Sequence, residues 1–329
     1  MAVPAQAEPL PTRGRRLVGV RRAFAPVTEA RGMTRTMLWL GTAITVGFIL
    51  LALLAPVIAP YEFDQFRSPD EGRFAQLEAP SRDHLMGTNV QSTDVLSRVI
   101  WGTQTELKVV LISLFFSISI GVPLGLLSGY FGGKLDRVLV LIMDALFVFP
   151  FLLLAIVIAF LLADRVGQGI FSAAIAITVV YIPLYFRVVR NHTISIREEP
   201  FVEAARALGA KPFTIIRKYV FFNVVQNVPP IATLNAADAI LTLAALGFLG
   251  YGIQPSAGAE WGYDIQRAVS DAASGIWWTG LFPGLAIVLL VTGLTLLGEG
   301  LNETINPVLR KRPLAKVDLR ATSSGVDQL

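Results

Sequence analysis

The sequence predicts an all-α integral membrane protein with six transmembrane helices and with both ends of the chain in the cytoplasm. Of its 329 residues, 53% are hydrophobic and only 16% are charged, and the apolar residues fall in long unbroken runs. Backbone groups in lipid must be hydrogen-bonded within the protein, so spanning segments are helices of about 20 apolar residues or strands of a closed barrel. Unbroken runs, unlike alternating ten-residue strands, indicate helices.

The first predicted span, 37–59, contains no charged residue over 23 positions, which is about 34 Å of helix. It is longer than the apolar core of a cleaved signal peptide and lies further from the N-terminus. The next four runs are 109–130, 138–162, 170–189 and 276–297. Between the last two lies 224–252, which is interrupted by Pro229, Pro230 and Asp238. Counted as a helix despite these breaks, it is the fifth of six spans.

The basic residues orient the predicted helices. With six spans and an internal N-terminus, segments 1–36, 131–137, 187–222 and 299–329 would be cytoplasmic, and they hold 21 of the 28 Lys and Arg residues. Cytoplasmic loops retain positive charge, so the distribution supports this topology. Residues 1–36 are expected to form a disordered basic tail near membrane lipid, and 303–329 a second cytoplasmic tail. Residues 60–105 would form an external segment.

Several functions are not expected. The chain has no cysteine and only two histidines, His84 and His192, so neither a disulfide framework nor a metal site is predicted. The net charge is +4, but the basic residues lie beside apolar segments, where they indicate orientation in the membrane and not nucleic-acid binding. No Ser, His and acid constellation is arranged for catalysis. The sequence therefore predicts a transporter without a catalytic, metal or cofactor site of its own.

Two carboxylates, Asp144 and Asp238, lie at predicted membrane depth, where a charge costs about 2.5 to 3.5 kcal/mol. Either they line a translocation path, or each accepts a hydrogen bond from a neighbouring helix or stays protonated. Gly121, Gly125 and Gly129 repeat every four residues, which predicts a face for close helix packing.

The cytoplasmic connection 190–222 is long enough to suggest a function. Pro200 suits the first turn of a helix, and Gly209 suits its end. The apolar positions of this short helix form one predicted stripe: Phe201, Ala204, Ala205 and Leu208. The stripe either docks a partner or packs on the protein's own bundle, and the pattern alone does not decide between them.

Glu203-Ala204-Ala205, with Gly209 four residues beyond, resembles the EAA loop of binding-protein-dependent ABC transporter permeases. The resemblance runs from residue 37 to about 312 and is closest to the C-type permeases of dipeptide, oligopeptide and nickel importers. The other stretches that carry it are Gly87-Thr88 with Asp94-Val95-Leu96-Ser97-Arg98-Val99-Ile100 and Gly102; Ala244-Ala245-Leu246-Gly247-Phe248-Leu249-Gly250 with Gln254-Pro255 and Trp261-Gly262; and Gly298-Glu299-Gly300-Leu301-Asn302 with Pro307. The family's usual Leu-Pro at the end of the loop is Phe221-Phe222 here.

The resemblance implies a type I ABC importer permease fold in a bacterial plasma membrane, with a five-helix core at 106–302. It also implies a second permease subunit, two cytoplasmic ATP-binding subunits that use the ATP, and an external solute-binding protein. Glu203, Ala204, Ala205, Arg206 and Gly209 would form the ATPase-coupling helix, and the cargo would be di- or oligopeptides. The alternative is a gradient-driven secondary transporter that uses Asp144 or Asp238.

Overall fold

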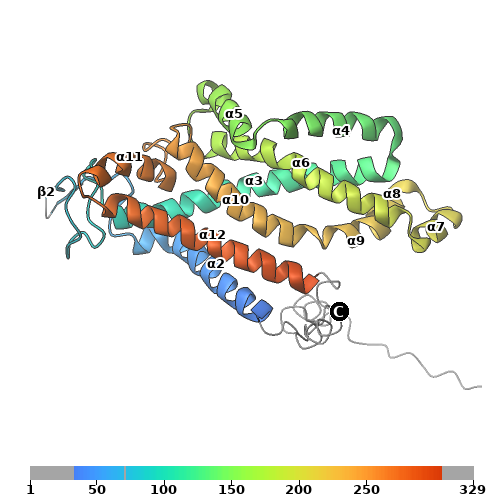
Figure 1. Cartoon of the computed structure of the whole chain (residues 1–329), viewed down its shortest axis with the longest axis horizontal. Coiled ribbons are helices and arrows are strands. Elements are labelled where there is room, and N and C mark those ends of the chain that lie inside the picture. The colour runs from blue at the N-terminus through green and yellow to red at the C-terminus, as the bar shows by residue number, and fades with distance from the viewer. Residues whose placement is uncertain (1–32, 70–71, 306–329) are drawn as a thin grey trace, which may run out of the picture.

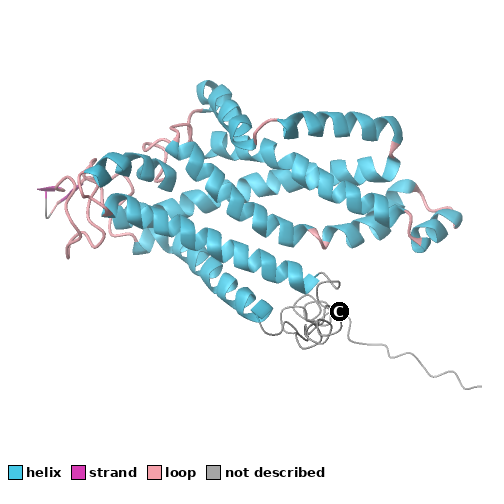
Figure 2. Ribbon diagram, viewed as in Figure 1, coloured by secondary structure: helices cyan, strands magenta, loops and turns pink. Residues whose placement is uncertain are grey.

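The computed structural model describes residues 33–69 and 72–305, and it confirms the predicted all-helical membrane fold (Figures 1 and 2). Among these described residues, five helices are long and apolar enough to cross a membrane. They are α2 (Met33–Ile58), α3 (Val95–Phe131), α6 (Ile170–Arg197), α10 (Val228–Phe248) and α12 (Trp278–Ile305). A sixth span is counted if the bent pair α4 (Gly133–Val148) and α5 (Phe151–Val166) crosses the membrane as one unit. The two expected tails fall largely on 1–32 and 306–329, outside the described residues.

The remaining elements lie at the two ends of the bundle (Figure 1). At one end are a short antiparallel pair, β1 (Arg67–Ser68) and β2 (Gly72–Arg73), and helix α11 (Trp261–Ala273). Near the opposite end lie α7 (Pro200–Ala207), α8 (Pro212–Ile215), the π-helical turn η1 (Ile216–Val220) and α9 (Phe221–Val225). We call these two ends of the bundle the α11 end and the α7 end.

The helix predicted over 138–162 is not continuous. The chain bends by 94° between α4 and α5. Pro150 has no N–H to donate, and its ring excludes helical backbone at the residue before it. Phe149 is accordingly extended, with φ −67° and ψ 136°. Figure 1 shows α4 running along α6, with α5 set at a steep angle to α4, and Ala155 and Ala159 of α5 are buried.

The weak predicted span 224–252 is broken at a turn at 226–227, just before its prolines, and its membrane-spanning part is α10. Pro229 and Pro230 occupy the first turn of α10, which begins at Val228, so their missing N–H groups remove no internal helical bond. The segment before the second spanning helix, predicted as 60–105, is shorter than expected, because α3 already begins at Val95 and continues for 37 residues.

The centre of the bundle is the contact between α3 and α6, which the glycine repeat predicted. A Cβ added at Gly125 would lie 2.7 Å from the carbonyl oxygen of Phe186, and one at Gly129 would lie 2.7 Å from that of Arg190. Side chains at these positions would therefore push the two backbones apart. Small residues at such contacts supply the close packing that holds helices together in lipid.

Candidate functional site

Helix α7 begins and ends at the residues that the sequence marks. Pro200 is its first residue, and Glu203 lies in its first turn. At its end, the N–H of Gly209 donates to the carbonyl of Arg206 at 3.0 Å, and the N–H of Ala210 donates to that of Ala205 at 3.1 Å. These two bonds form a Schellman motif, which places its C′ residue in the left-handed region. Gly209 has φ +81° and satisfies that requirement without strain.

The buried face of α7 differs from the predicted stripe. Val202 and Ala205 are buried and belong to the main hydrophobic core, whereas Phe201 and Ala204 are exposed. Leu208 is 89% exposed. The prediction of one apolar stripe combined two faces, because Val202, which was left out of it, is the residue that anchors the helix. We call the exposed residues Phe201, Glu203, Ala204, Arg206 and Leu208 the α7 surface.

Both carboxylates predicted at membrane depth accept a hydrogen bond from α6. Tyr181 donates its hydroxyl to Asp238 at 2.7 Å. Arg187 Nη2 donates to Asp144 Oδ1 at 2.8 Å, and both side chains of this pair remain about half exposed. Asp238 is likewise exposed on the described chain. Both carboxylates therefore accept a hydrogen bond from a neighbouring helix, and their place in a translocation path stays a prediction.

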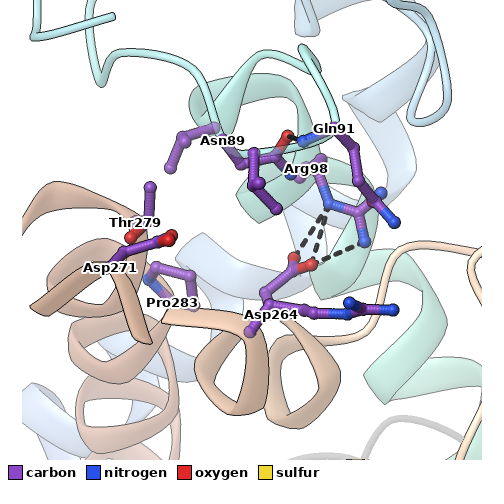
Figure 3. Close-up of a pocket in the computed structure, with 10 residues that line it drawn as sticks. Asn89, Gln91, Arg98, Asp264, Asp271, Thr279 and Pro283 are labelled. Atoms are coloured by element: carbon purple, nitrogen blue, oxygen red, sulfur yellow. Dashed lines mark hydrogen bonds and ion pairs between the residues drawn. The ribbon is translucent and has the colours of Figure 1, made fainter. Parts of the chain in front are cut away.

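A buried polar cluster at the α11 end was not identified from the sequence. Arg98 of α3 donates from Nε and Nη2 to the carboxylate of Asp264 on α11, at 2.7 to 3.0 Å (Figure 3). Glu260 caps α11 by accepting from the N–H groups of Gly262 and Tyr263. Burial raises the pKa of Glu260 to about 8 against these two bonds, which lower it.

Two of the stretches that carried the family resemblance meet in this cluster. Gly102 of α3 lies against the indole of Trp261, which donates to the carbonyl of Val99 at 3.1 Å. A Cβ at Gly262 would lie 2.0 Å from the carbonyl oxygen of Ala244. Asp264 lies outside the quoted stretches, and the opposite charges of Arg98 and Asp264 are the sequence signal that could have suggested their pairing.

The pocket beside this cluster is too small for a peptide. Its volume is about 10 Å³, which is room for roughly one water molecule. Figure 3 shows Asp271 and Thr279 on one side of it and the Arg98–Asp264 pair on another. Within 33–69 and 72–305, acidic and histidine side chains form no group of three suited to a metal ion.

Comparisons with known proteins agree on one family. Residues 121–311 match the model of the binding-protein-dependent transport system inner membrane component. A dipeptide transport system permease protein, DppC, from Alkalihalophilus pseudofirmus is 35% identical over 82% of this chain and 85% of its own length. The glutathione transport system permease protein GsiD of Pectobacterium atrosepticum is 32% identical over 86% of this chain and 92% of its own.

One solved structure has a similar fold. A chain of the inward-facing MetNI methionine ABC transporter matches with a TM-score of 0.53 and 24% identity. The match covers 64% of this chain and 96% of that chain. At this identity the likeness concerns the fold.

Proposed function

Because the chain belongs to the family of binding-protein-dependent transport system inner membrane components, we propose that it is a permease subunit of an ATP-driven peptide importer. It is a multi-pass protein of a bacterial plasma membrane. The peptide cargo is supported by the relatives named for dipeptide and glutathione transport, since glutathione is itself a tripeptide. A gradient-driven transporter using Asp144 or Asp238 has no support from these relatives.

In the proposed assembly this chain forms half of the translocation path, and a second permease subunit forms the other half. Two ATP-binding subunits would drive transport at the α7 end, and an external solute-binding protein would deliver the peptide at the α11 end. The charge distribution supports this orientation, with both chain ends in the cytoplasm.

The observation that carries the coupling proposal is the two-sided construction of α7. Val202 and Ala205 fix one side to the protein's own core, while the α7 surface faces away from it. Glu203, Ala204 and Arg206 lie on the exposed side, and Gly209 ends the helix in a defined turn. A helix held in this way transmits a push from a partner to the packed bundle instead of bending alone. Packed bundles respond to such pushes by switching between discrete arrangements.

Co-purification from detergent tests the proposal. The complete chain, expressed with its ATP-binding subunits, is compared with Glu203→Lys and Gly209→Pro variants. Pro fixes φ near −65°, whereas Gly209 has φ +81°, so the second change removes the turn that ends α7. Glu62→Lys makes the same charge change on an exposed residue near the α11 end and is the control.

We expect the ATP-binding subunits to co-purify with the intact chain and with Glu62→Lys, and to be lost or uncoupled from transport in the two α7 variants. Unchanged co-purification and transport in both α7 variants would show that α7 is not the contact. A chain that purifies alone and still transports would overturn the importer proposal itself.

A further inference from the structure

Helix α4 is held to the bundle mainly by charge. Within the described structure it buries only one of its sixteen side chains, Met143. Two ion pairs connect it to α6, Asp136 with Arg190 and Asp144 with Arg187. Most of its surface, including Leu141 and Val148, therefore faces away from this chain. In the complete transporter that surface must meet lipid, another subunit or water.

The two ion pairs differ in construction. Arg190 donates from Nε and Nη2 to both oxygens of Asp136 at 2.6 and 2.7 Å, and these side chains are only 24% and 20% exposed. Arg187 makes one hydrogen bond to Asp144 at 2.8 Å, and these side chains are 40% and 50% exposed. The first pair is a closed structural clamp. The second leaves most of the guanidinium donors without a partner among the described residues.

Phe147 packs against the guanidinium of Arg187, in the more exposed of the two ion pairs. The guanidinium carbon of Arg187 lies 3.8 Å from the centre of the Phe147 ring. An aromatic face at this distance holds the guanidinium by cation–π attraction and fixes its plane. A planar guanidinium with free donors matches a carboxylate, which it binds through two parallel hydrogen bonds.

The bend between α4 and α5 is a second unusual feature of the same segment. The 94° bend at Phe149 and Pro150 follows Asp144 within six residues. Exposed apolar side chains flank the bend on both sides, with Val148 81% exposed before it and Leu153 exposed after it. At such a break the last carbonyls of one helix and the first N–H groups of the next lack helical partners. In a membrane, irregular backbone and charged side chains are tolerated where they are covered by protein or line a water-filled cavity.

We propose that the Arg187–Asp144 pair and the α4–α5 bend form a part of the translocation path that contacts the termini of the peptide. This rests on the proposed function as a peptide importer. When the path holds no peptide, Arg187 is hydrogen-bonded to Asp144. An arriving peptide carboxylate displaces it and takes the guanidinium through two bonds, and the freed Asp144 faces the peptide ammonium group. The weak packing of α4 allows the pair to separate.

Substituted cysteines test whether this face meets water. The chain contains no cysteine, so a single one introduced by Val148→Cys is a unique label site. Leu53→Cys, on an exposed apolar position of α2, is the matched control for a lipid-facing surface. In the reconstituted complete transporter, we expect a charged, membrane-impermeant thiol reagent to label Val148→Cys, to do so more slowly with saturating dipeptide, and to leave Leu53→Cys unlabelled. Absence of labelling at Val148→Cys, as in a subunit interface or in lipid, overturns the proposal.

A substrate comparison tests the assigned chemistry. Transport of a dipeptide is compared with that of its C-terminal amide, using the same solute-binding protein throughout. We expect Arg187→Gln to lower dipeptide uptake at least tenfold and to reduce the ratio of free-acid to amide uptake. Arg190→Gln, which opens the structural clamp, is expected to lower the amount of folded transporter without changing that ratio. An Arg187→Gln variant with the wild-type ratio overturns the proposal, whereas a wild-type transporter without ATP-driven peptide uptake overturns the proposed function instead.

Discussion

Replacing Arg98 with alanine is expected to destabilise the protein by about 3 to 5 kcal/mol, the usual result of removing one partner of a buried ion pair. The side chains of Arg98 and Asp264 are only 3% and 9% exposed, and three N···O contacts of 2.7 to 3.0 Å join them. Arg98 also donates to the carbonyl of Phe63 at 2.9 Å. The substitution therefore leaves a carboxylate and a carbonyl without their donor.

Protonation limits this loss. Burial raises the pKa of Asp264 although Arg98 opposes it, so removing Arg98 is expected to raise this pKa further and to favour the neutral carboxyl. The destabilisation should accordingly grow as the pH rises. The double variant Arg98→Ala/Asp264→Asn carries no buried charge and is expected to regain part of the lost stability.

The assay is equilibrium unfolding in mixed micelles with increasing SDS, followed by far-UV circular dichroism. Glu198→Ala breaks the more exposed Arg197–Glu198 pair, with side chains 29% and 68% exposed, and is expected to lose no more than about 1 kcal/mol. If Arg98→Ala is no less stable than Glu198→Ala, or if the double variant is less stable than the sum of its single changes, the reasoning from burial fails.

Two further predictions use the same unfolding assay. Gly125→Ala is expected to lose about 1 to 3 kcal/mol because its Cβ would meet the backbone of α6 at 2.7 Å, whereas Gly47→Ala, with open space around it among the described residues, should gain roughly 0.5 to 1 kcal/mol of helix stability. Equal effects of the two changes would contradict the packing argument. Glu260, with its pKa raised from 4.5 to about 8, binds its proton more tightly when folded, so its contribution to stability should be fully present below pH 4.5 and should be lost as pH rises toward 8. Glu260→Gln should flatten that part of the pH profile, and parallel profiles for the two proteins would show that Glu260 ionises normally.

The spans were predictable because the bilayer imposes a length and a composition that the sequence carries directly. The bend between α4 and α5 was missed for the same reason. Hydropathy over 138–162 remains high on both sides of Pro150, so an apolar run does not distinguish a straight helix from a broken one. The local signal was present in Pro150 itself, which disfavours helical backbone at Phe149.

The limits of helix α7 could be predicted from its local sequence, but its buried face could not. Its limits follow from Pro200 and Gly209, which act within one turn of the chain. The choice of buried face depends on tertiary contact, since Val202 packs into the core while Leu208, equally apolar, stays exposed. Because several apolar residues surround this short helix, the prediction from periodicity alone grouped the wrong residues on one face.

The residues of the motif stretches and the residue of the proposed peptide contact have different roles. Gly102, Trp261 and Gly262 carry the family resemblance, and the structure uses all three for close packing at the α11 end. Arg187, by contrast, lies in none of the quoted stretches, and its guanidinium is half exposed and only partly bonded. Changes at the packed residues should therefore reduce the yield and stability of the fold, while changes at Arg187 should alter which peptides pass through a transporter that still assembles.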